Sequence, residues 1–182
     1  MKRLILASAA AAFAVMVWGF VFWAGGGAEA GFSQLDSPTE LALRELMDRD
    51  FPESGTYVVP QMEGGTMEEW TARHLAGPLA FVMVTKAGTN PASPRVYLMG
   101  FLHIMLTALL LGLLMTRALP TSLTYGRRIG FAILTGVLVA FWSNLSDPIW
   151  FYQPWAYHLV TTVYDIIAFA IMGAVLGRFL KE

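Results

Sequence analysis

The chain has 182 residues, of which 56% are apolar and only 14% are charged. Soluble globular domains carry about a quarter charged residues, so a soluble fold of this composition would lack the polar surface to cover its core. Cysteine is absent, which excludes a disulfide framework, a thiolate metal site and a cysteine nucleophile. The basic residues form no patch of the kind that binds nucleic acid, so no nucleic-acid partner is expected.

Four apolar stretches are long enough to cross a hydrocarbon core of roughly 30 Å as helices. In chain order they cover approximately residues 4–24, 97–115, 129–143 and 157–179. The third is the shortest and is bracketed by Arg127, Arg128 and Asn144. It spans only if these polar side chains extend to the interfaces. The chain is therefore expected to be an integral membrane protein in contact with the lipid bilayer.

The first stretch imitates a secretory signal, because Lys2 and Arg3 precede an alanine-rich run and residues 28–30 (AEA) resemble a cleavage site. Two features favour a retained membrane anchor. The apolar run has roughly 20 residues, which is longer than the apolar region of a signal peptide. It also ends in aromatic residues, which anchor at membrane interfaces. Glycines 25–27 and Gly31 then predict a flexible neck.

The segment after the neck predicts a small cap of mixed helix and strand. Ser37 is the expected N-cap of its first helix, with Glu40 three residues later in a capping box. Thr66 and Glu69 repeat this pattern at the start of the second helix. The two strands that follow these helices are expected at residues 55–60 and 79–85.

No catalytic arrangement is predicted in the cap, where His74 is the only histidine. Glu63, Glu68 and Glu69 form an acidic cluster that could bind a cation. A solvated acidic face is the favoured interpretation, and no metal site is expected.

Two histidines within or near the predicted spans could hold a haem iron or a metal. His103 lies about two turns into the second span, and His158 lies at the start of the fourth. Imidazoles from different helices at similar depth are typical haem ligands. The favoured alternative is that each imidazole binds a backbone carbonyl or lies at the wet interface, and no cofactor is identified.

Polar residues share one face of the fourth span. His158, Thr161, Thr162 and Asp165 follow the spacing i, i+3, i+4 and i+7, which aligns them on a helix. A carboxylate at membrane depth costs a few kcal/mol, so this face must look into the helix bundle. We expect the face to join helices through hydrogen bonds. A path for protons or a site for a quinone headgroup is the alternative.

The fourth span also contains the GxxxG pair Gly173 and Gly177, which we place on the side away from the polar face. Such a pair lets two helices approach closely. The pattern does not decide whether the partner helix is internal or belongs to another subunit.

Aromatic residues are dense around the loop between the third and fourth spans. An interfacial aromatic belt accounts for them, and a docking surface for lipid tails, a pigment or a partner is the alternative. The residues of this predicted belt are Trp142, Trp150, Tyr152, Trp155 and Tyr157.

Basic residues predict the orientation of the four spans. Seven of the 12 lysines and arginines lie on one side of a four-span topology, whereas residues 25–95 hold ten of the 13 acidic residues and five basic ones. The positive-inside rule makes the basic side cytoplasmic, which predicts a bacterial inner-membrane protein with both termini inside and a periplasmic cap. The seven residues are Lys2, Arg3, Arg117, Arg127, Arg128, Arg178 and Lys181.

The predicted fold is therefore a membrane all-α protein: a four-helix transmembrane bundle with a small α+β external cap between helices 1 and 2. Three segments follow from it. They are an anchor helix over residues 1–24, the cap over 25–96 and a three-helix region over 97–182.

Several segments resemble a group of small bacterial inner-membrane proteins. The segments are WGFVFW in the first span, PESGTYVVP, AGPLAFVMV and the aromatic run from Trp150 to Tyr157. The resemblance implies one anchor helix, a short external domain and three further helices. The group has no established activity, so the resemblance supplies a topology and no function.

The functional expectation is a non-catalytic accessory or structural subunit of a larger membrane complex, respiratory, photosynthetic or involved in transport. No nucleophile, base and oxyanion set can be assembled, and no inverted repeat indicates a transporter. Partner subunits or further copies of the chain are expected. The alternative is a small redox protein that binds haem or quinone through His103, His158 and Asp165.

Overall fold

A computed structural model describes residues 1–62, 64–120 and 122–179. The chain divides into two compact units, which are treated separately below. The helical unit comprises Met1–Phe32, Pro91–Ser146 and the chain from Trp155 onward. The small unit comprises Ser33–Asn90 and Asp147–Pro154.

Most of the described chain is helical, and four helices are long and apolar enough to cross a membrane. This confirms the four predicted stretches. The candidate spans are Lys2–Gly31, Pro94–Ala118, Tyr125–Trp150 and Trp155–Phe179. The helices that form them are α1 (Lys2–Phe22), η1 (Trp23–Gly27), α2 (Ala28–Gly31), α5 (Pro94–Ala118), α6 (Tyr125–Asn144), α7 (Ser146–Trp150) and α8 (Trp155–Phe179).

At the predicted glycine neck the first span is kinked, because Gly25 and Gly26 have non-helical backbone angles. Beyond the kink, the short helix α2 extends as far as Gly31. Gly26 has φ of 111°, a backbone conformation that favours glycine. Gly31 then lies against α8, where an added Cβ would stand 3.6 Å from Val160.

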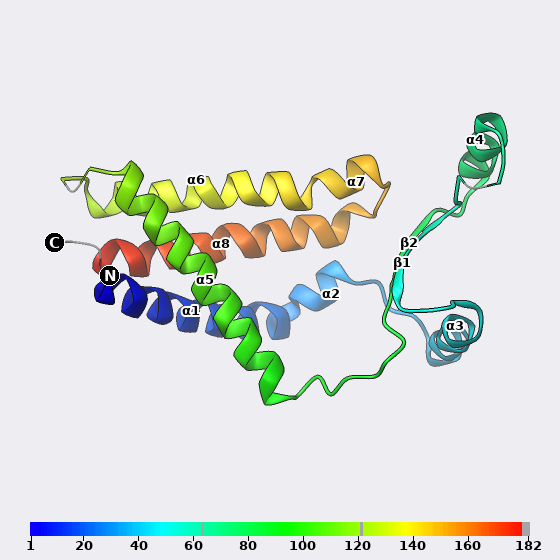
Figure 1. The fold of residues 1–182 in the computed structure, drawn as a ribbon, viewed down its shortest axis with the longest axis horizontal. Helices are drawn as coiled ribbons and strands as arrows, with labels where there is room; N and C mark the ends of the chain where they lie inside the picture. The colour runs from blue at the N-terminus through cyan, green and yellow to red at the C-terminus, as the bar shows by residue number, and fades with distance from the viewer. Residues whose placement is uncertain (63, 121, 180–182) are drawn as a thin grey trace. The chain divides into compact units, whose positions relative to one another are not determined.

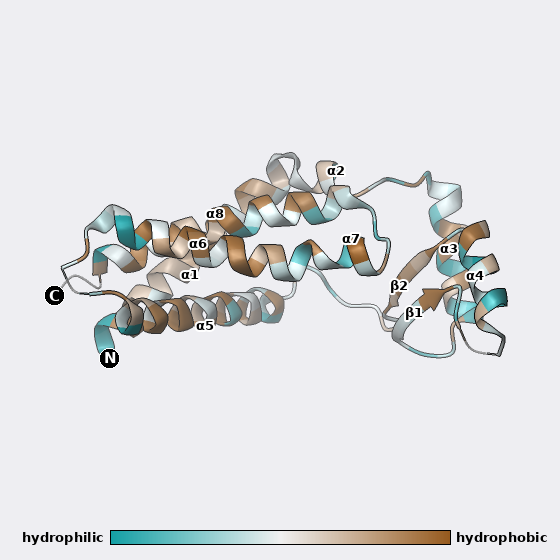
Figure 2. Cartoon of the chain, turned by 90° about the horizontal axis from the view of Figure 1, so that it is seen from above, coloured by the Kyte–Doolittle hydropathy of each residue, from teal (hydrophilic) through white to brown (hydrophobic). Residues whose placement is uncertain are grey.

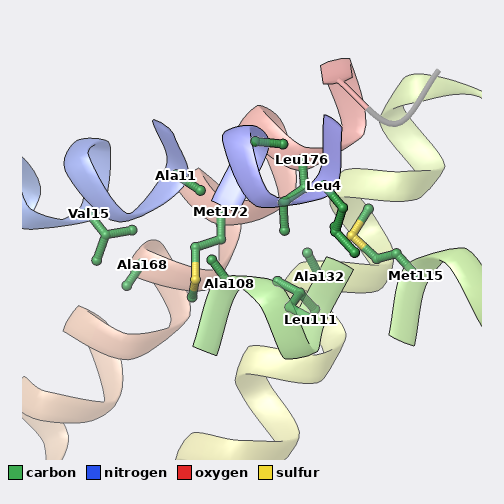
Figure 3. Close-up of a cluster of buried hydrophobic side chains, with 11 residues drawn as sticks. Leu4, Ala11, Val15, Ala108, Leu111, Met115, Ala132, Ala168, Met172 and Leu176 are labelled. Atoms are coloured by element: carbon green, nitrogen blue, oxygen red, sulfur yellow. The ribbon is translucent and has the colours of Figure 1, made fainter. Parts of the chain in front are cut away.

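The four long helices pack as a series, α5 on α1, α1 on α8 and α8 on α6 (Figure 1). Small side chains on α1 make this possible: Ala7, Ala11 and Ala12 are fully buried, and alanine allows close approach of two helix backbones. Larger side chains such as Leu111 and Met172 fill the space between the helices (Figure 3).

The contact of α6 with α8 is the most extensive in the helical unit. A Cβ added to Gly136 of α6 would lie 2.5 Å from Phe169 Cβ of α8. A Cβ added to Gly173 would collide with the Cβ of Ala132, and Gly177 lies against Tyr125. The partner of the GxxxG pair is therefore the internal helix α6.

The small unit contains α3 (Ser37–Asp50), β1 (Gly55–Val59), α4 (Met67–Ala76) and β2 (Ala80–Val84) in that order. This is the predicted order of helix, strand, helix and strand. The two strands pair antiparallel, with Gly55 opposite Val84 and Val59 opposite Ala80. Charged and apolar residues alternate along α3 and α4 (Figure 2).

Both helices of the small unit begin with a side-chain cap. The capping box of α4 is as predicted: Thr66 Oγ1 accepts from the Glu69 N–H at 3.2 Å, and Glu69 Oε2 accepts from the Thr66 N–H at 2.8 Å. The cap of α3 is Asp36 rather than Ser37, since Asp36 Oδ1 accepts from the Thr39 N–H at 2.9 Å. Asp and Ser are equally good caps, so the sequence did not distinguish the two neighbours.

Lys86, two residues after β2, bonds to the carboxyl end of α3. Its ammonium group donates to the carbonyl oxygens of Asp48 at 2.7 Å and Phe51 at 2.8 Å. These are among the terminal carbonyls that lack intrahelical partners. The loop after α7 also belongs to this unit, and the ring of its Phe151 is tilted against the Phe81 ring with centroids 5.3 Å apart.

Replacing Gly136 with alanine is expected to lower the free energy of unfolding by about 1–3 kcal/mol, because the added methyl group overpacks the contact with Phe169. Gly130→Ala on the same helix is the matched control, since nothing lies within 4 Å of its added Cβ. Both can be measured by reversible unfolding in mixed detergent micelles. Equal effects of the two substitutions would contradict the packing of α6 on α8.

The side-chain cap of α3 predicts that the stability of the first turn of this helix depends on pH. Hydrogen bonds from the hydroxyl and then the backbone N–H of Thr39 hold the pKa of Asp36 below its ordinary value of 3.8. A carboxylate with a lowered folded-state pKa stabilises the helix above its ordinary pKa and loses this effect as the pH falls through the folded value. The first turn of α3 should therefore loosen below pH 3.8.

Nuclear magnetic resonance of the Thr39 amide can follow this loosening. Asp36→Asn keeps a neutral acceptor at the cap, so its Thr39 signal should not respond to the same acidification. A response of the same size in both proteins would show that Asp36 is not the titrating cap.

Candidate functional site

The polar contact between α6 and α8 is formed by Asn144 and Asp165. Asn144 Nδ2 donates to Asp165 Oδ2 at 2.8 Å, and both residues are partly buried. Asn144 is the last residue of α6, whereas Asp165 lies well inside α8. The bond therefore joins two candidate spans.

Asn144 was not predicted as a site residue. The sequence suggested that it reaches a membrane interface, whereas it turns towards α8. The Ser143 hydroxyl donates to the Val139 carbonyl at 2.8 Å and lies 3.3 Å from Asn144 Oδ1. The signal that could have identified Asn144 is its place at the end of an apolar stretch, where a second polar residue can meet the carboxylate.

Asp165 and the GxxxG pair lie on the same side of α8, which corrects the predicted opposite placement. Asp165 contacts α6 through Asn144, and Gly173 contacts α6 through Ala132. Phe169 lies between them and faces Gly136. Residues four apart on a helix form one ridge, so α8 presents a single ridge to α6.

An aromatic cluster lies next to the Asn144–Asp165 contact, between α1 and α8. The Tyr164 ring is 5.3 Å from the Phe22 ring and 5.7 Å from the Trp23 ring, between centroids. Trp18 stacks at 6.4 Å with an interplanar angle of 10°, and its indole N–H donates to the Tyr164 carbonyl at 3.4 Å. These rings fix α1 against α8, a role that the sequence did not assign to them.

Thr161 and Thr162 do not act as predicted. The Thr162 hydroxyl donates to the His158 carbonyl at 2.7 Å, and the Thr161 hydroxyl lies 3.0 Å from the Tyr157 carbonyl and 3.1 Å from that of His158. All these acceptors belong to α8. The threonines satisfy their hydroxyl groups within their own helix and do not join two helices.

The structure does not bring His103 and His158 together. His103 is exposed on α5, whereas His158 is buried on α8. The two helices run towards the same end of the unit (Figure 1) and approach at Gly112 and Leu176. His103 precedes Gly112 by about two and a half turns and His158 precedes Leu176 by about five, so the imidazoles lie at different levels.

No group of three or more His, Asp or Glu residues that could hold a metal ion occurs in residues 1–62, 64–120 and 122–179. In the acidic cluster of the small unit, Glu69 belongs to a capping box and Glu68 is exposed. Glu63 lies outside the described residues, as does Lys181 of the basic set.

Arg128 departs from the expected behaviour of a basic residue at the end of a span. It is buried near the start of α6, and its Nε donates to the Leu123 carbonyl at 3.1 Å. The Tyr125 hydroxyl nearby donates to the Ala174 carbonyl of α8 at 3.0 Å. Polar contacts therefore join α6 and α8 near both ends of α6.

The residues of the predicted aromatic belt are exposed. Two of them also have a defined neighbour: the Tyr152 ring lies 4.9 Å from the His74 ring, and the Tyr157 ring lies 5.1 Å from the Phe32 ring, between centroids. The five exposed belt residues are Trp142, Trp150, Tyr152, Trp155 and Tyr157.

No family model, curated protein or solved structure matches this chain. The chemistry of the Asn144–Asp165 contact must therefore be read from its geometry. An amide that donates to a carboxylate holds two helices together. This contact and the aromatic cluster around Tyr164 form one structural joint.

A double-mutant cycle of Asn144→Ala and Asp165→Ala is expected to give a coupling energy of about 1 kcal/mol, the size of a hydrogen bond between membrane helices. The measurement is unfolding in mixed micelles. Asn144→Ala combined with Thr162→Val is the control, because the Thr162 hydroxyl bonds within α8. The effects of these two substitutions on the free energy of unfolding should be additive. Additivity of the Asn144 and Asp165 substitutions would rule out the joint.

Proposed function

We propose that this chain is a non-catalytic accessory subunit of a larger bacterial membrane complex, anchored by its four apolar helices and docked through its small unit. The observation that carries this proposal is the exposure of large apolar side chains on the small unit. Leu75 of α4 is 83% exposed, Met83 of β2 is 77% exposed and Leu41 of α3 is 56% exposed.

These side chains belong to a segment that is rich in charged residues and is therefore expected to lie in water. Residues 33–90 contain nine acidic and four basic residues, in contrast to the apolar spans. Large exposed apolar areas on such a segment are characteristic of surfaces that bind another molecule. A complex that covers α3, α4 and β2 would remove these side chains from water at a gain of about 25 cal/mol per Å².

The outer surfaces of the helical unit support membrane anchoring. Leu106 and Leu110 of α5 and Leu134 and Leu138 of α6 are all exposed. Side chains of this kind suit contact with lipid tails or with apolar helices of a partner. The bundle leaves these faces open because α5 packs mainly on α1, and α6 mainly on α8.

We further propose that both termini are cytoplasmic and that the small unit is periplasmic. The start of α1, the end of α5, the start of α6 and the end of α8 lie at one end of the helical unit (Figure 1). Lys2, Arg3, Arg117, Arg127 and Arg178 lie at these helix ends. The positive-inside rule supports a cytoplasmic location for this end and a bacterial inner membrane as the site.

Purification from native membranes in a mild detergent is expected to yield the chain with at least one other protein at a stoichiometric ratio. Native mass spectrometry measures the ratio, and a wash in harsher detergent that releases the partner serves as the control. Recovery of the chain alone would contradict the accessory function. A Soret band in the absorption spectrum of the isolated chain would contradict it in favour of haem binding.

A further inference from the structure

Basic side chains collect at one end of the helical unit, where the start of α1, the end of α5, the start of α6 and the end of α8 meet (Figure 1). A Cβ added to Gly112 of α5 would lie 2.5 Å from Leu4 of α1 and 3.4 Å from Leu176 of α8. A Cβ added to Gly177 of α8 would lie 3.5 Å from the Cβ of Arg128 of α6. We call this region the basic end, and its exposed basic residues are Lys2, Arg3, Arg117, Arg127 and Arg178.

Among the described residues, no acidic side chain offsets the charge of the basic end. The acidic residues in the described part of the helical unit are Glu29 and Asp165. Glu29 belongs to α2, at the opposite end of the first span, and Asp165 bonds to Asn144 at the opposite end of α6. The ion pairs within residues 1–62, 64–120 and 122–179 lie in the small unit. The basic end therefore has a net positive charge.

Three arginines flank the connection from α5 to α6. Arg117 lies in the last turn of α5, and Arg127 and Arg128 lie in the first turn of α6. No acidic residue occurs between Arg95 and Asp147 in the sequence. Arg128 is buried, so Arg117 and Arg127 are the arginines of this group that a ligand can reach.

Exposed apolar side chains adjoin these two arginines. Leu113 and Leu114 of α5 are exposed and precede Arg117 by four and three residues, so they share its side of the helix. Leu134 of α6 is also exposed and follows Arg127 by seven residues, which is about two turns. A ligand that covers both kinds of side chain needs an anionic head and long apolar chains. This is the chemistry of an anionic phospholipid.

We infer that the basic end binds an anionic phospholipid, with the phosphate at Arg117 and Arg127 and the acyl chains along the exposed leucines of α5 and α6. Arginine at the end of a span keeps its stem among apolar groups while its charge reaches the headgroups. Each basic residue at a membrane surface strengthens the binding of anionic lipid about fivefold. A zwitterionic phospholipid offers the same chains without the net charge. The inference goes beyond the accessory function, because it requires no protein partner.

The test titrates the full chain, in micelles of a mild detergent, with phosphatidylglycerol or with phosphatidylcholine of the same acyl chains. Native mass spectrometry measures the dissociation constant of the first lipid bound. Phosphatidylglycerol should bind at least about fivefold more tightly. A higher ionic strength should reduce this preference, because salt screens exposed charges. Equal affinities of the two lipids, or a preference that salt leaves unchanged, would overturn the inference.

Two pairs of substitutions change the net charge of the chain equally. Arg117→Gln with Arg127→Gln removes two charges from the basic end, whereas Arg95→Gln with Arg44→Gln removes one from the start of α5 and one from α3. All four side chains are exposed, and circular dichroism checks that the helices are kept. The first pair should weaken binding of phosphatidylglycerol at least about fivefold and leave binding of phosphatidylcholine unchanged. The second pair should change neither, and equal effects of the two pairs would overturn the inference.

Two further measurements separate a lipid from other anionic ligands. Glycerophosphoglycerol is the headgroup of phosphatidylglycerol without its acyl chains, and it should not bind at the concentrations at which the lipid binds. Binding as tight as that of the lipid would assign the basic end to a soluble phosphate. A protein that co-purifies from native membranes and is released by Arg117→Gln with Arg127→Gln, while the affinity for phosphatidylglycerol is unchanged, would assign it to an acidic protein surface. Either result would overturn the inference.

Discussion

The close packing of α8 on α6 is the contact on which the helical unit depends. Gly136 and Gly173 bring the two helices together, and the Asn144–Asp165 hydrogen bond and the Tyr125 hydroxyl fix them near both ends of α6. In a membrane, apolar side chains gain little by leaving lipid, so van der Waals contact and polar bonds must hold helices together. The helix α1 packs on α8, and α5 packs on α1. The position of α5 therefore depends on both of these contacts.

The same constraint explains how the polar side chains of the spans are used. A polar group facing lipid costs free energy unless it is paired, and Asp165 is paired with the amide of Asn144. The threonine hydroxyl groups of α8 bond to carbonyls of their own helix. Under the proposed function, recognition is left to the small unit, where α3, α4 and β2 expose large apolar side chains.

Local sequence rules predicted the elements well and the contacts poorly. The length of the apolar stretches identified the four candidate spans, and the capping box of Thr66 and Glu69 identified the start of α4. Both signals depend only on residues that are close together in the sequence. The α-helical periodicity grouped Thr162 with Asp165, yet it could not say which acceptor each would choose. The partner of Asp165 comes from a different helix, and only the register of α6 against α8 brings Asn144 to it.

Cysteine cross-linking in native membranes tests the central claim, that the Asp165 carboxylate is part of a joint between α6 and α8. The chain has no cysteine, so introduced pairs report without background. Asn144→Cys with Asp165→Cys should cross-link with a short bifunctional thiol reagent, because the two hydrogen-bonded side chains leave a gap that is too wide for a direct disulfide. Trp142→Cys with Asp165→Cys should not cross-link, because Trp142 is 82% exposed. Absence of the first cross-link, or equal yields of both, would contradict the joint.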